Sequence, residues 1–227
     1  MTVIGILFDL GGTLLENTYR PSVTFQKILE QKGIQVKEEE VQEALERTEA
    51  DLADFLEDSG KIHSKDFYNL WDIQVLKFLG IKSYTADLIS HIHAQWSEVC
   101  GEALFSDVLP TIEILKKKHI KIGIVTNAYE KEVTDIFQRI ECPLTLFDCI
   151  VGVDTTGKRK PHPDIFHHAL QVLDIPADKT LFIGDDIEKD YYGARQAGIR
   201  ALLLAREGSP SHDVQYISSL SSIEAFL

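Results

Sequence analysis

Cysteine is scarce in this chain of 227 residues, which has only Cys100, Cys142 and Cys149. Their number is odd, and no two of them have the spacing of a paired metal-ligand motif, which argues against a disulfide framework or a cysteine metal site. We therefore expect buried free thiols in a reducing compartment, with the cytoplasm as the default location.

Basic residues are also in short supply. The chain has 23 Lys and Arg against 36 Asp and Glu, a formal net charge of −13. An extended contact with nucleic acid or with an anionic membrane needs a basic face, so we expect neither as a partner. Any anionic ligand must be met locally, by a cation or by backbone N–H groups.

Long hydrophobic runs and several common enzyme motifs are missing. The apolar stretch at residues 3–8 has no basic segment before it and is interrupted by Asp9, so it predicts a strand, not a signal peptide or a membrane span. The patterns GxxxxGK[ST], GxGxxG and GxSxG do not occur. Their absence removes the usual P-loop, dinucleotide-binding and serine-hydrolase interpretations.

What the chain does contain is an alternation of strand-like and helix-like segments. Hydrophobic residues make up 44% and charged residues 26%, which is typical of a soluble globular protein. Continuous apolar runs, typical of strands buried on both faces, occupy residues 3–8, 120–125, 149–153, 180–183 and 201–204. Amphipathic segments of helical length occupy residues 111–118, 130–140, 163–173 and 188–197. This alternation predicts an α/β fold with a parallel sheet wrapped by helices.

The stretch between the first two strands has a different pattern. From about residue 19 to residue 96 the apolar positions recur with the helical period, and no strand is evident. We therefore predict a core built from residues 1–16 and 100–227, interrupted by an all-helical insert at 17–99. A core of that size with one insert fits the length of the chain.

Polar residues follow the predicted strands, at the edge where ligands bind in sheets of this kind. Each group taken alone could be an ordinary turn or helix cap. Together they would place several carboxylates, a Thr, an Asn and a Lys at one edge of the sheet. The groups are Asp9, Gly11, Gly12 and Thr13 after the first strand, Thr126 and Asn127 after the second, Lys160 after the third, and Asp185, Asp186 and Asp190 after the fourth.

These residue types predict a cation site with phosphate chemistry. Carboxylates crowded together repel one another, so Asp9, Asp185 and their acidic neighbours need a counter-cation. Mg²⁺ suits oxygen ligands and keeps open positions for a phosphate. The side chains of Thr126, Asn127 and Lys160 offer donors to phosphate oxygens. A carboxylate beside the metal can act as a nucleophile, and Asp9 is the best-placed candidate.

In this order, the four groups resemble the motifs of the haloacid dehalogenase-like hydrolase superfamily. The first motif corresponds to Asp9 through Thr13, the second to Thr126, the third to Lys160 and Pro161, and the fourth to Gly184, Asp185, Asp186 and Asp190. The helical insert after the first motif is similar to the family's helical cap.

The resemblance implies a Rossmann-like three-layer core, an inserted all-α cap, Mg²⁺ and a nucleophilic Asp9. It implies metal ligation by Asp9, the Gly11 carbonyl and Asp185. It also implies that Thr126 and Lys160 stabilise phosphate, and we add Gly12, Thr13 and Asn127 to the phosphate-binding set. Asp186 and Asp190 are assigned supporting roles, and the family divides the metal duties of such acids in more than one way. We favour Asp190 as the residue near the metal.

One position departs from the family pattern. Phosphatases of this family usually carry a second Asp, which protonates the leaving group, where this chain has Gly11. Three outcomes follow: a phosphatase for good leaving groups such as acyl or anomeric sugar phosphates, replacement of the acid by Glu16 or a cap residue, or weak or lost activity.

We expect an Mg²⁺-dependent hydrolase of a small phosphorylated metabolite. The alternatives are a metal- or phosphate-binding protein that has lost catalysis and, least favoured, a 2-haloacid dehalogenase. The dehalogenase branch also lacks the second Asp, but it dispenses with the metal and has a less acidic fourth motif. The sequence specifies neither the substrate nor the oligomeric state.

Overall fold

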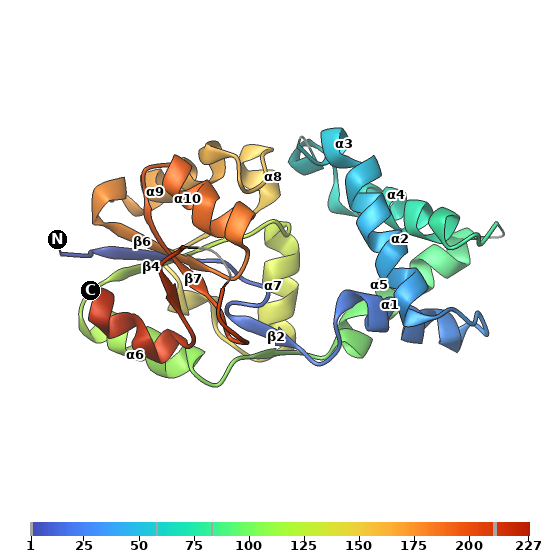
Figure 1. The fold of residues 1–227 in the computed structure, drawn as a ribbon, viewed down its shortest axis with the longest axis horizontal. Helices are drawn as coiled ribbons and strands as arrows, with labels where there is room; N and C mark the ends of the chain where they lie inside the picture. The colour runs from blue at the N-terminus through green and yellow to red at the C-terminus, as the bar shows by residue number, and fades with distance from the viewer. Residues whose placement is uncertain (1, 58, 83, 211–212) are drawn as a thin grey trace. The chain divides into compact units, whose positions relative to one another are not determined.

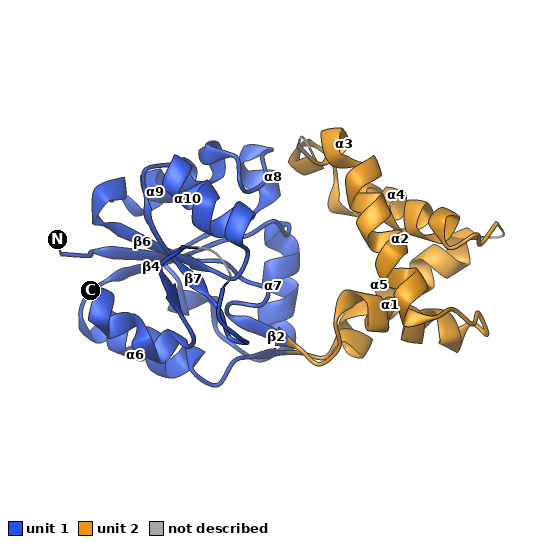
Figure 2. Cartoon of the chain, in the orientation of Figure 1, with its two compact units in different colours: residues 1–16, 103–227 blue, residues 17–102 orange. Residues whose placement is uncertain are grey.

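The protein is represented by a computed structural model that describes residues 2–57, 59–82, 84–210 and 213–227. The chain separates into two compact units, Met1–Glu16 with Ala103–Leu227, and Asn17–Glu102 (Figure 2). The predicted insert at 17–99 compares with a second unit of Asn17–Glu102, whose last helix ends at Cys100.

The core unit contains a parallel six-stranded sheet in the order β5-β4-β1-β6-β7-β8 (Figure 1). The strands are β1 (Gly5–Phe8), β4 (Lys121–Val125), β5 (Cys149–Val151), β6 (Thr180–Gly184), β7 (Arg200–Leu204) and β8 (Tyr216–Ile217). The predicted α/β class is therefore confirmed. The third predicted strand ends at Val151 because Val153 begins the short helix α8 (Val153–Thr156). The two-residue strand β8 has no counterpart among the predicted strands.

Helices cover both faces of this sheet, because alternate strand residues point to opposite sides. Ile6 and Phe8 of β1 belong to one buried apolar cluster, and Leu7 belongs to the other. The first cluster includes residues of α6 (Val108–Lys117), α7 (Glu130–Arg139) and the 3₁₀ segment Leu220–Phe226. The second includes residues of α9 (Pro163–Leu173) and α10 (Gly193–Gln196). The result is a three-layer core.

The strand register brings the polar groups together. Phe8, the last residue of β1, is level with Ile124 of β4 and with Ile183 of β6. The Asp9 amide continues this pairing by donating to the Ile183 carbonyl at 2.9 Å. Residues that follow β1, β4 and β6 therefore emerge at one edge of the sheet.

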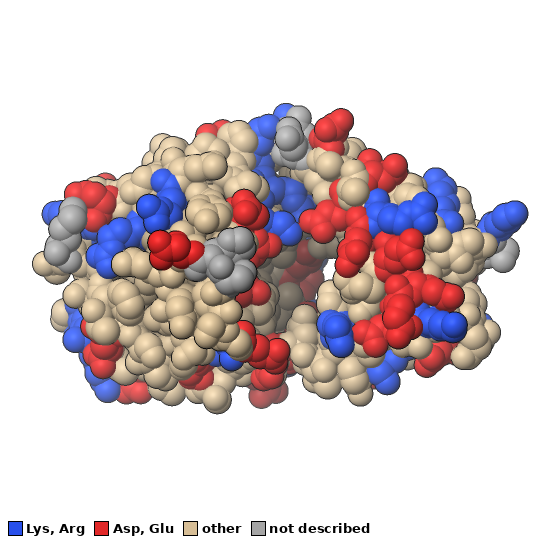
Figure 3. All heavy atoms as spheres, in the orientation of Figure 1, with Lys and Arg blue, Asp and Glu red and all other residues tan. Residues whose placement is uncertain are grey.

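The second unit is helical, as predicted, with its own apolar core. Its helices are α1 (Pro21–Gln31), α2 (Glu38–Asp51), α3 (Ala53–Glu57), α4 (Ser64–Phe78) and α5 (Ala86–Cys100), with a 3₁₀ turn at Ser59–Lys61. Phe25, Ile28 and Leu76 are fully buried in that core. Acidic side chains gather over this unit on the face shown in Figure 3.

A short ribbon lies where the chain passes between the two units. It consists of β2 (Leu15–Asn17) and β3 (Glu102–Leu104), which form a two-stranded sheet. Within the described ranges, no helix is long and apolar enough to cross a membrane.

Candidate active site

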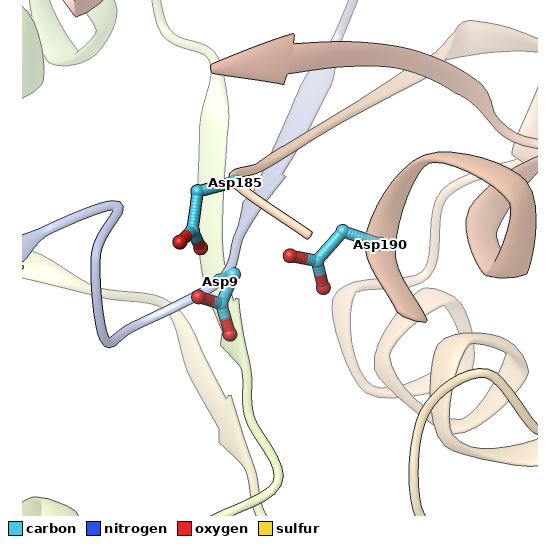
Figure 4. A group of neighbouring side chains, drawn as sticks. All are labelled: Asp9, Asp185 and Asp190. Atoms are coloured by element: carbon cyan, nitrogen blue, oxygen red, sulfur yellow. The ribbon is translucent and has the colours of Figure 1, made fainter. Parts of the chain in front are cut away.

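Three carboxylates converge at the edge of the core sheet. Asp9 follows β1, Asp185 follows β6, and Asp190 lies on the π-helix Ile187–Tyr192 (Figure 4). One carboxylate oxygen from each residue lies within 4.8 Å of one from each of the others. Asp9 and Asp190 are buried, whereas Asp185 is exposed. The sequence-predicted acids after the first and fourth strands therefore form one cluster.

Lys160 joins the two buried members of this cluster. Its Nζ atom contacts Asp9 Oδ1 and donates to Asp190 Oδ1 at 2.6 Å, and its side chain is only 3% exposed. Burial alone would lower the pKa of Lys160, but the carboxylates of Asp190 and Asp9 outweigh burial and raise that pKa. The ammonium group is therefore held in its charged form.

One ammonium group does not balance three carboxylates. Burial raises the pKa of Asp9, and it raises the pKa of Asp190 to about 6. The pKa of Asp185 is also raised: although this residue is exposed at the surface, the surrounding protein atoms desolvate its carboxylate, and the Asp190 charge adds to the effect. A hard divalent cation with oxygen ligands fits this donor set, because it would neutralise the remaining charge and leave positions for a phosphate.

The loop after β1 turns closely around Asp185. Gly12 has a φ of +74°, and a Cβ atom at that position would lie 2.3 Å from Asp185 Oδ2. Thr13 is fully buried, and its hydroxyl donates to Asp185 Oδ1 at 3.2 Å. Position 12 therefore requires glycine, both because of its left-handed backbone conformation and because the Asp185 carboxylate leaves no room for a Cβ atom. Phosphate binding by Gly12 and Thr13 stays a prediction.

Gly11 differs from its neighbour in both respects. Its φ lies outside the left-handed range, and a Cβ atom built there has no described atom within 4 Å. Neither the backbone nor the local packing requires glycine at this position. The core unit has room for the first atom of a side chain at position 11, so the absence of the acid is not imposed by the fold.

Asn127 is bonded to the backbone of Lys160. The Lys160 amide donates to Asn127 Oδ1 at 2.7 Å, and Asn127 Nδ2 donates to the Lys160 carbonyl at 3.2 Å. These two bonds fix the segment that delivers the Lys160 side chain to the carboxylates. Thr126 is buried, and its hydroxyl oxygen accepts from the Ala128 amide at 3.2 Å. Contact of Thr126 and Asn127 with phosphate stays a prediction.

The two remaining acids of the fourth motif have different surroundings. Asp186 Oδ1 accepts from the amides of Glu188 and Lys189 at 2.9 and 2.8 Å, so this side chain caps the π-helix. Asp190 Oδ2 accepts from the Asp186 amide at 3.1 Å, and Asp190 belongs to the carboxylate cluster. The geometry therefore favours Asp190 over Asp186 as the acid beside a metal.

Gly184 is a site-forming residue for which the sequence predicts no role. A Cβ atom at Gly184 would lie 2.2 Å from Asp190 Oδ2, so only glycine lets that carboxylate approach the end of β6. The available signal was a glycine that ends an apolar strand directly before an acidic pair.

Replacement of Lys160 by Met is expected to lower the free energy of unfolding by about 3–5 kcal/mol in the absence of metal, because it leaves buried carboxylates without their partner. Urea denaturation in EDTA measures this loss, and added Mg²⁺ should recover part of it. Lys189→Met is the matched control, since it removes an exposed ion pair with Asp186 and should cost at most about 1 kcal/mol. Equal stability of Lys160→Met and the wild type in EDTA would contradict the assigned electrostatics.

The sequence matches the family described as haloacid dehalogenase-like hydrolase over residues 6–204. The chain is 26% identical over 213 residues to haloacid dehalogenase-like hydrolase domain-containing protein 3 of Danio rerio, with 91% of this chain and 87% of that protein covered. It is 34% identical over 119 residues to the pyrophosphatase PpaX of Bacillus mycoides, and this alignment covers 50% and 51% of the two chains.

Among solved structures, the fold is similar to that of the HAD-hydrolase YfnB from Bacillus subtilis bound to magnesium. The TM-score is 0.78 at 19% identity, with 99% of this chain and 98% of that chain covered. The chain therefore belongs to the haloacid dehalogenase-like hydrolase family, and the predicted resemblance is confirmed. It is a hydrolase, and one relative of this chain is named as a pyrophosphatase.

Proposed function

We propose that this protein is an Mg²⁺-dependent phosphatase that acts on a small phosphorylated metabolite through an aspartyl-phosphate at Asp9. The observation that carries the proposal is the cluster of Asp9, Asp185 and Asp190 with the buried Lys160. The pyrophosphatase relative supports phosphate chemistry. The magnesium in the solved YfnB structure supports the choice of ion.

In this proposal the chain supplies the metal ligands from two loops. Asp9, Asp185 and the Gly11 carbonyl would hold Mg²⁺, with Asp190 close by. When bound, Mg²⁺ supplies charge neutralisation and polarises phosphate oxygens. Lys160 would donate to the phosphate from the side of Asp9, and the Thr126 hydroxyl would add a further donor.

The reaction would proceed in two displacements at phosphorus. An Asp9 carboxylate oxygen attacks the phosphorus atom, the bond to the leaving oxygen breaks, and the leaving group takes the electron pair. Water then attacks the phosphorus of the aspartyl-phosphate, loses a proton to solvent, and releases inorganic phosphate and the Asp9 carboxylate. Lys160 holds the carboxylate in place before the attack.

The need to protonate the leaving group determines which class of substrate the site can hydrolyse. Gly11 provides no proton donor at the position where the resemblance calls for one. The preferred substrates are therefore those whose leaving group departs as a stable anion, such as acyl or anomeric sugar phosphates. Phosphate release from an aryl phosphate and an acyl phosphate, with Mg²⁺ and then with EDTA, tests this proposal. No turnover with either compound in Mg²⁺ would overturn it.

Gly11 also motivates a second candidate, a metal- or phosphate-binding protein without turnover. Calorimetry would then show Mg²⁺-dependent binding of phosphate or an unreactive phosphate analogue, with no product formed. Dehalogenation ranks last. A metal-independent reaction does not need a cluster of three carboxylates, and it does not account for the raised pKa values of Asp9, Asp185 and Asp190. Halide release from a 2-haloacid in EDTA would reverse that ranking.

Binding of Mg²⁺ is expected to strengthen as the pH rises through about 6. The pKa of Asp190 is raised to about 6, so below that pH the carboxylate is protonated. A proton on this carboxylate competes with the cation and weakens its binding. The raised pKa values of Asp9 and Asp185 act in the same direction. The increase in melting temperature caused by Mg²⁺ should be larger at about pH 7.5 than at about pH 5. An increase that is equal at both pH values would contradict ligation by this cluster.

A further inference from the structure

Arg206 and Asp107 form a partly buried ion pair that the proposed chemistry does not use. Arg206 follows β7, and Asp107 precedes α6. The guanidinium group donates to both Asp107 oxygens, each at 3.1 Å, and the two side chains are only 18% and 12% exposed. This bidentate geometry matches the planar fork of arginine, which a lysine cannot reproduce.

Asp107 is anchored in turn to the C-terminal segment. Its Oδ2 atom accepts from the Ser219 hydroxyl at 2.8 Å and from the Leu220 amide at 2.9 Å. Burial would raise the pKa of Asp107, but the hydrogen bonds from Arg206, Ser219 and Leu220 outweigh burial and hold that pKa below its ordinary value. The pair is therefore a fixed, charged anchor between the start of α6 and the start of the last 3₁₀ segment.

The other side of Arg206 reaches the loop that carries the nucleophile. Its Nη2 atom donates to the Thr13 carbonyl at 2.7 Å, and its guanidinium carbon lies 3.6 Å from the centre of the Phe105 ring. The Thr13 hydroxyl bonds Asp185 at 3.2 Å. Thr13 is thus held from two sides, by Arg206 at its backbone and by Asp185 at its side chain.

We propose that Arg206, held by Asp107, is a positioning residue that fixes the loop after β1 in the conformation that presents the metal-binding oxygens. The part of this inference that concerns the metal rests on the proposed function. The part that concerns the loop does not, because the contacts with Thr13 and Asp107 exist independently of any reaction. A partner that orients a metal ligand from outside the coordination sphere commonly changes metal affinity by about 10–100-fold.

Two variants and a control test the proposal. Arg206→Met removes all three bonds, whereas Arg206→Lys keeps the charge and loses the fork. Arg200→Met is the matched control, since Arg200 begins β7, the strand that precedes Arg206, and its Nη2 atom donates to the Phe226 carbonyl at 3.4 Å. Hydrogen exchange followed by mass spectrometry reports on the loop amides, and calorimetry reports on Mg²⁺ affinity.

The loop amides provide the readout that is independent of metal. The amides of Leu14 and Leu15 donate to the Leu10 carbonyl at 2.8 Å, and the amide of Gly12 donates to the Leu15 carbonyl at 2.8 Å. In Arg206→Met these three amides should exchange at least about tenfold faster, while amides of β4 and β6 exchange as in the wild type. A general loss of stability would accelerate both regions together.

The two readouts separate the possible failures. We expect Arg206→Met to weaken Mg²⁺ binding by about 10–100-fold, Arg206→Lys to weaken it less, and Arg200→Met to leave it unchanged. Wild-type loop exchange and wild-type Mg²⁺ affinity in both Arg206 variants would overturn the role of Arg206. A wild-type protein that binds no Mg²⁺ would overturn the proposed function, and loop exchange would then decide the role of Arg206 alone. If Arg206→Met does not fold, Arg206→Lys carries the same two measurements.

Discussion

Replacement of Asp9 by Asn is expected to reduce phosphatase turnover on the order of 10⁶-fold, the size of loss that follows removal of a covalent nucleophile from a hydrolase. The carboxamide has nearly the same shape as the carboxylate, but its atoms cannot form the aspartyl-phosphate. Phosphate release from an acyl phosphate in saturating Mg²⁺ measures the effect. The substitution touches the reacting oxygen itself, so neither Lys160 nor the metal can compensate for it.

The fold should survive this substitution, which makes the activity loss interpretable. Burial and the neighbouring Asp185 charge both raise the pKa of Asp9, so ionised Asp9 is costly in the folded protein and its neutral replacement is tolerated. The melting temperature without metal should be equal to or above that of the wild type. Asp164→Asn, an exposed acid near the start of α9, is the control and should retain activity. Substantial turnover by Asp9→Asn would exclude Asp9 as the nucleophile.

Replacement of Gly11 by Asp is expected to raise turnover of alkyl phosphates by about 10²–10⁴-fold, the usual contribution of a general acid and base. Gly11 has no positive φ, and a Cβ atom at this position meets no described atom within 4 Å, so neither the backbone nor the first atom of the new side chain is strained. Turnover of acyl phosphates should change little, because their leaving group departs without a proton. Steady-state rates on a matched pair of such substrates measure the difference.

Gly11→Asn is the matched control for this gain. It adds a side chain of the same size that cannot transfer a proton, so it should leave turnover of both substrates close to the wild-type values. An equal gain in Gly11→Asn would show that size, not acidity, is responsible. No gain in Gly11→Asp would mean that another group, such as Glu16 or a residue of the helical unit, already supplies the proton.

Much of the core could be predicted because its signals are local. Five of the six strands of the main sheet coincide with apolar runs of the sequence, and such runs are typical of strands that are buried on both faces. The acidic and glycine-rich groups stand directly at the ends of those runs. Parallel strand order then places Asp9 and Asp185 at one edge without any further information.

The remaining features depend on contacts between distant residues, which a single sequence does not display. Asn127 looks like a phosphate donor in isolation, but its carboxamide bonds to the backbone of Lys160, 33 positions away. Arg206 and Asp107 are 99 positions apart, and neither stands beside a recognisable motif. The strand β8 has only two residues, so it carries no periodicity from which a strand can be predicted.

The covalent state of Asp9 during turnover tests the central claim most directly. Wild-type protein is mixed with an acyl phosphate and Mg²⁺, quenched in acid within one turnover, digested with trypsin and analysed by mass spectrometry. We predict that the peptide of residues 1–27 gains the mass of one phosphoryl group, that borohydride reduction converts Asp9 to homoserine, and that Asp9→Asn shows neither change. Phosphate release by the wild type, with no phosphorylated form of this peptide at any quench time and no reduction at Asp9, would contradict the account.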